Sequence, residues 1–116
     1  MKKFIVIYYA NKEAQAEMEK SGNQSEEDIK KAMEPWMEWA KACGDNLVDL
    51  GTPLGGGKKI TSSGSEASEK GAVGYSILQA NSMDDAEKML QNHPHTSWNA
   101  GCSIEVYEAM PLPELN

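Results

Sequence analysis

The chain has 116 residues, of which 40% are hydrophobic and 25% charged, and these values are typical of a single globular domain spanning residues 1–116. Acidic residues outnumber basic ones by 18 to 11, and every basic residue is lysine. Because a phosphate backbone is bound by clustered cations, we expect no nucleic-acid partner. No run of about 20 apolar residues is present, so we expect no membrane association. Cys43 and Cys102 show no metal or redox spacing, which favours reduced thiols in a cytoplasmic protein.

The first half of the chain predicts one strand and two helices. Residues 4–9 are apolar, β-branched and aromatic, which favours a strand buried on both faces. A short helix is expected around residues 12–20, and a longer one begins at the N-cap Ser25 and ends at Gly44. Pro35 predicts a kink or a restart in this longer helix, because proline removes a backbone hydrogen bond. The apolar stripe expected to face the core consists of Ile29, Met33, Trp36, Met37 and Ala40.

The second half predicts three more strands and one more helix. Residues 55–71 are rich in Gly, Ser, Lys and Glu, and they predict a long mobile hairpin loop with a short strand at 59–61. Ser82 is expected to cap the next helix, with Asp85 at its third position. The remaining strands are expected over residues 46–50, 73–80 and 102–110.

The predicted elements follow the order βαββαβ, which is the order of an α+β, ferredoxin-like plait with an antiparallel sheet. Two helices cover only one face of a four-stranded sheet, and the first strand is apolar on both sides. A second copy of the chain, packed sheet against sheet, would cover the other face. We therefore expect a homodimer that forms through this sheet face.

Six segments in the expected order resemble the YCII-related family, and specifically its DGPF-domain branch: residues 1–9, 36–39, 44–55, 74–80, 93–95 and 104–111. The resemblance implies a small protein of the dimeric α/β-barrel type. It also implies a histidine and aspartate pair in a cleft, which His95 and Asp49 match here. The histidine that the family carries on its first helix has no counterpart, and the Asp-Gly-Pro-Phe signature is absent.

His95 and Asp49 are the candidate catalytic residues, because a histidine that titrates near neutral pH suits general acid or base catalysis. The alternative for His95 and the neighbouring His93 is that both cap a helix C-terminus. Asp49 is equally interpreted as a turn residue before Gly51. A His-x-His pair without a third ligand predicts no metal site, and we expect no cofactor.

Aromatic residues supply further candidates for a ligand pocket. Trp98 follows His95 and is a candidate aromatic lid, while Trp39 lies off the predicted core stripe and would wall a pocket or touch a partner chain. Trp36 lies on the stripe and is expected to pack in the core. Pocket candidates on strands, expected to reach a cavity between two sheets, are Tyr8, Tyr75 and Tyr107. His93, two residues before His95, is a further pocket candidate.

Three functions remain open at this stage. The first is a small-molecule-binding protein or enzyme with a site near Asp49, His95 and Trp98. The second is a non-catalytic dimeric interaction module. The third, a monooxygenase-like protein that needs no cofactor, rests on analogy of fold alone.

Overall fold

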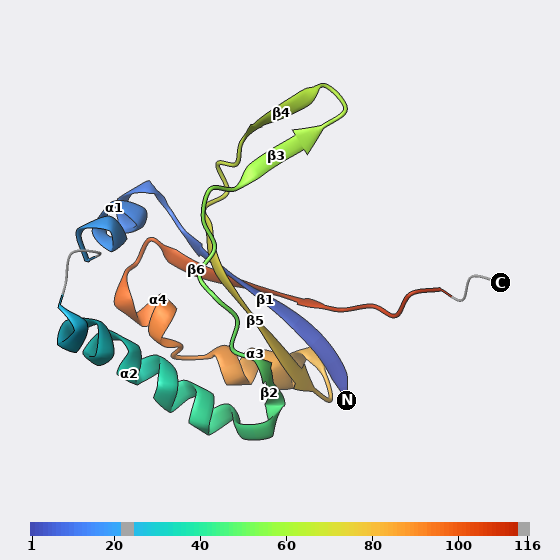
Figure 1. Ribbon diagram of the computed structural model, residues 1–116. Helices are drawn as coiled ribbons and strands as arrows, with labels where there is room; N and C mark the ends of the chain where they lie inside the picture. The colour runs from blue at the N-terminus through green and yellow to red at the C-terminus, as the bar shows by residue number, and fades with distance from the viewer. Residues whose placement is uncertain (22–24, 114–116) are drawn as a thin grey trace.

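The computed structural model describes residues 1–21 and 25–113, and it confirms the α+β class and the βαββαβ order of the main elements (Figure 1). In chain order the elements are β1 (Lys2–Ala10), α1 (Lys12–Ser21), α2 (Glu26–Cys43), the 3₁₀ turn η1 (Gly44–Asn46), β2 (Leu47–Asp49), β3 (Lys58–Thr61), β4 (Gly64–Ala67), β5 (Ala72–Ala80), α3 (Met83–Leu90), α4 (Pro94–Trp98) and β6 (Cys102–Glu108). None of the described helices is long and apolar enough to cross a membrane.

The main sheet has the strand order β2-β5-β1-β6, and each neighbouring pair is antiparallel. The central strand β1 pairs Ile5 with Ile77 of β5 and Ile7 with Glu105 of β6. Strands separated along the chain by helices thus lie side by side, which is the connectivity of the ferredoxin-like plait. The predicted antiparallel sheet is confirmed.

Successive side chains along β1 point to opposite faces of the sheet. Phe4, Val6 and Tyr8 are buried beneath the helices, whereas Ile5 and Ile7 are half-buried on the opposite face. Figure 1 shows α2, α3 and α4 on one side of the sheet. The main core cluster lies between these layers and contains Phe4, Val6, Tyr8, Trp39, Leu78, Ala80 and Ala86.

The long helix α2 runs without a break through Pro35, so the predicted restart does not occur. The side chain of Ser25 caps its start by accepting a hydrogen bond from the N–H of Asp28, at 3.3 Å, as predicted. The predicted core stripe is wrong at three of its five positions, because Ile29, Met33 and Met37 are exposed.

Trp39, which lies off the predicted stripe, faces the core and is 8% exposed, and Trp36 of the stripe is partly buried against the same core cluster. The indole N–H of Trp39 donates to the main-chain oxygen of Met89 at 2.8 Å. The helix is rotated on the sheet so that this large ring is buried and its single N–H donor has an acceptor. Only the second half of α2 therefore packs on the core.

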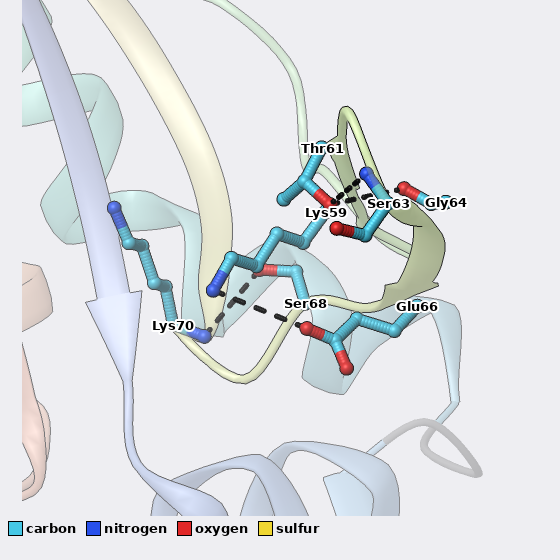
Figure 2. Close-up of polar contacts among 7 residues, drawn as sticks. All are labelled: Lys59, Thr61, Ser63, Gly64, Glu66, Ser68 and Lys70. Atoms are coloured by element: carbon cyan, nitrogen blue, oxygen red, sulfur yellow. Dashed lines mark hydrogen bonds and ion pairs between the residues drawn. The ribbon is translucent and has the colours of Figure 1, made fainter.

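Residues 55–71 include a second, two-stranded sheet that projects from the body of the molecule (Figure 1). Figure 2 shows how it is held: the hydroxyl of Thr61 accepts from the N–H of Ser63 at 3.2 Å and donates to the oxygen of Gly64 at 3.4 Å. Lys59 and Glu66 form an ion pair across the strands at 3.9 Å. The hairpin is present as predicted, and both of its strands are exposed. Its mobility stays a prediction.

Candidate functional site

The short helix α4, which the sequence reasoning missed, positions both histidines. His93 is its N-cap residue, and Pro94 occupies the first turn, where proline is favoured. The imidazole Nδ1 of His93 accepts a hydrogen bond from the N–H of His95 at 2.9 Å. Because α3 ends at Leu90, the alternative in which both histidines cap the C-terminus of that helix is wrong.

His93 is fully buried in a cluster of aromatic rings. The ring centroids of Trp39, Trp36 and Tyr8 lie 4.4, 4.7 and 5.1 Å from that of the imidazole. Burial, followed by the nearby His95, lowers the pKa of His93 to about 4. Since Nδ1 accepts a hydrogen bond, the ring proton is on Nε2, which has no hydrogen-bond partner among the described residues. His93 is therefore a neutral structural residue at neutral pH.

His95 is held by the backbone of the central strand. Its Nε2 lies 2.8 Å from the main-chain oxygen of Tyr9, and a carbonyl only accepts, so Nε2 carries the proton and Nδ1 the lone pair. Burial lowers the pKa of His95 and outweighs the backbone contacts with Tyr9 and Ser103, which raise it. His95 is thus a neutral imidazole with one fixed tautomer, and its Nδ1 has the chemistry of a base.

Tyr8 is the third polar group at this place, and its proton also has a fixed direction. The hydroxyl of Ser76 donates to the main-chain oxygen of Leu50 at 2.6 Å. Ser76 has one hydroxyl hydrogen, so at its 2.7 Å contact with Tyr8 it is the acceptor and the phenol is the donor. Burial raises the pKa of Tyr8 to about 12, although the Ser76 contact lowers it. Tyr8 therefore stays protonated, with lone pairs left over on its oxygen.

A cavity of about 280 Å³ adjoins these groups. Tyr8, Trp36 and His95 line it from the helix-covered side, together with Met18 of α1 and Met33 of α2. Its other wall is the segment Leu50–Pro53 and the start of β5, including Tyr75.

The wall of the cavity depends on a close approach between two segments. Gly51 adopts a φ of +83°, and a Cβ placed there would lie 1.7 Å from the oxygen of Tyr75. Only glycine permits both this conformation and this contact.

The predicted site residues are divided among several places. His95, Tyr8 and Tyr75 line the cavity, and His93 packs behind it. Trp98 lies at an adjoining hollow that His95 also lines, and the indole is 49% exposed. Tyr8 faces the helices, so its predicted place between two sheets is wrong.

Two further candidates lie away from the cavity. Trp39 is a core residue, and Tyr107 is exposed on the open sheet face, where it contacts Glu105.

Asp49 and His95, the pair predicted as a dyad, do not meet. Asp49 is exposed, does not line the cavity, and accepts a hydrogen bond from the N–H of Gly51 at 2.8 Å. This is the turn role that was the alternative interpretation. Among the described residues, no group of three or more His, Cys, Asp or Glu side chains could hold a metal ion.

Trp36 and Ser76 are the site residues that the sequence reasoning missed. Trp36 was expected to pack in the core; it is partly buried against the core cluster, and it also lines the cavity. Ser76 carried a usable signal: on strand 73–80 it shares a face with Leu78 and Ala80, so a polar side chain was due to be buried there.

No protein-family model and no curated protein matches the sequence. A solved structure that resembles the chain is that of 5-chloro-2-hydroxyhydroquinone dehydrochlorinase from Burkholderia phenoliruptrix, in complex with 2,5-dihydroxybenzoquinone. The two share 14% identity with a TM-score of 0.47, over 89% of this chain and 90% of that one. Similarity at this level does not bear on the activity of this chain.

Proposed function

We propose that this protein binds a small organic molecule in the cavity, with His95 as the group that accepts a hydrogen bond or a proton from it. The observation that carries the proposal is a neutral imidazole of fixed tautomer in the wall of a largely apolar cavity. Such a combination of apolar surface and a few oriented polar groups is typical of ligand sites.

The same geometry supports a catalytic role for His95 if the bound molecule presents an acidic hydrogen to Nδ1. Transfer of that hydrogen would leave an imidazolium whose Nε2–H is already bonded to the oxygen of Tyr9. A carbonyl at this position stabilises the cation and holds the ring in place. Tyr8, with its raised pKa, would remain protonated and act in binding.

A thermal-shift screen of metabolites against the wild-type chain and His95→Ala tests the proposal. We expect at least one compound to raise the Tm of the wild type and to have little effect on the variant. Tyr107→Phe is the control, since this exposed phenol lies outside the cavity. An unchanged ligand response in His95→Ala would contradict the role of His95.

The second candidate, a homodimer through the sheet face, is favoured by the apolar stripe opposite the helices. Ile5 pairs with Ile77 and Ile7 with Tyr75, and no described helix covers these side chains. A partly exposed apolar patch without a covering layer is typical of an interaction surface. Light scattering is expected to give twice the mass of one chain, and a stable monomer at micromolar concentration would contradict the dimer.

A further inference from the structure

Three of the hydrogen-bond donors in the cavity wall are already used within the protein. The phenol of Tyr8 donates to Ser76, because the hydroxyl hydrogen of Ser76 is held by the oxygen of Leu50. The Nε2–H of His95 donates to the oxygen of Tyr9. The hydroxyl of Thr52 donates to the oxygen of Pro53 at 3.2 Å.

The same groups keep unused lone pairs. They are the oxygens of Tyr8 and Thr52 and the Nδ1 of His95, and all three residues line the cavity. The indole N–H of Trp36 has no hydrogen-bond partner among the described residues and remains an open donor in the wall. Among these side chains the open acceptors therefore outnumber the open donors, and a ligand satisfies the acceptors only by supplying donors.

The absence of charged side chains in the wall restricts the class of ligand further. None of the described residues that line the cavity is Lys, Asp or Glu. An anion would meet lone pairs without a counter-charge, and a cation would find no carboxylate to replace its water. Transfer of either ion into this cavity is unfavourable, so a neutral molecule fits best.

The shape of the wall favours a ring. Tyr8 and Trp36 meet edge to face with centroids 5.1 Å apart, and Tyr8 and His95 lie 5.3 Å apart. An apolar protein cavity of about 150 Å³ is known to hold benzene, and this one measures about 280 Å³. One substituted ring fits such a volume.

We infer that the cavity selects uncharged ring compounds that carry hydroxyl or N–H donors, and that Ser76 sets this preference by fixing the direction of the Tyr8 proton. The inference rests on the proposed function and adds the class of ligand to it. Ser76 is a positioning residue here, because it acts through Tyr8.

Four one-ring probes separate the possibilities: phenol is a neutral donor, anisole lacks the donor, benzoate is an anion and benzylamine is a cation. Binding to the full chain is followed by tryptophan fluorescence, with titrations extended into the millimolar range. We expect phenol to bind about tenfold more tightly than anisole, the effect of one good hydrogen bond, and benzoate and benzylamine to bind more weakly than phenol.

Substitution of Ser76 tests the mechanism of this preference. In Ser76→Ala the hydroxyl hydrogen of Tyr8 loses its acceptor and can turn toward the ether oxygen of anisole. The phenol-to-anisole ratio of affinities is therefore expected to fall to about twofold. Tyr8→Phe, which removes the acceptor, should lower the ratio as well, and it serves if Ser76→Ala fails to fold. Ser63→Ala, on the exposed hairpin, is the control that keeps the ratio.

Three results would overturn the inference and still leave the cavity a ligand site. They are equal binding of phenol and anisole, tight binding of benzoate, and a phenol-to-anisole ratio of affinities that stays unchanged in both folded variants. Failure of all four probes would also overturn it. The metabolite screen with His95→Ala then decides separately on the proposed function.

Discussion

Each of the two faces of the main sheet departs in one respect from the usual division of polar and apolar residues. Beneath the helices, the buried set includes Ser76, His93 and His95. On the open face, Ile5 and Ile7 stay partly exposed. Buried polar groups require partners, whereas an apolar surface left in water favours contact with another surface. This difference is the basis of the two proposals, a ligand site on the covered face and a contact with a second chain on the open face.

The largest expected effect belongs to the covered face. Trp39→Ala removes a buried ring and leaves the oxygen of Met89 without its donor, so the free energy of unfolding should fall by about 3–5 kcal/mol. Trp98→Ala is the matched control, because this indole is half exposed, and it should cost less than about 1 kcal/mol. Urea unfolding of both variants measures the difference, and similar losses would contradict the placement of Trp39.

Acid should weaken the covered face through His93. Its pKa is about 4 in the folded chain and near 6.5 when unfolded, so the unfolded state binds the proton first as pH falls. The free energy of unfolding should therefore be constant above about pH 6.5 and decrease by about 3 kcal/mol as pH falls to 4. Urea unfolding across this range measures the slope.

His93→Asn provides the control for this pH dependence. Asparagine is a good N-cap residue and does not titrate, so the variant should have a flatter profile between pH 6.5 and 4. A residual slope from His95, whose pKa is also lowered, is expected. A profile as steep as that of the wild type would exclude His93 as the main source.

The open face is tested by a charge placed in its apolar stripe. Ile7→Lys should dissociate the proposed dimer, because the ammonium groups would be desolvated between two sheets, and should lower the stability of the chain itself by only about 1 kcal/mol. Light scattering measures the mass and circular dichroism the fold. A dimer that persists in Ile7→Lys would place the interface elsewhere.

The smallest effect is expected for Tyr107→Phe, at the exposed edge of the open face. The lost contact with Glu105 lies in solvent, and the free energy of unfolding should change by less than about 0.5 kcal/mol. A larger loss would mean that this contact is protected from water, as it would be inside an interface.

Local chemistry made several elements predictable. The helix starts follow from Ser25 and Ser82, each of which accepts a hydrogen bond from a backbone N–H three residues later. Strands β1 and β5 could be predicted because each contains a short run rich in apolar, β-branched and aromatic residues, which is typical of a buried strand. Helix α4 was missed because its five residues are too short for a periodic pattern.

The sequence by itself determined the order of the elements, the antiparallel plait and the presence of His95 and Tyr8 as candidates, because capping and alternation act over a few residues. Tertiary structure alone decided that Trp39 is buried while Trp36 lines the cavity, since the rotation of a helix depends on the surface it meets. It also separated Asp49 from His95 and joined Tyr8 to Ser76, 68 positions along the chain. Contacts between segments far apart in sequence depend on which strands pair and in what register, and this is settled only when the whole sheet assembles over one core.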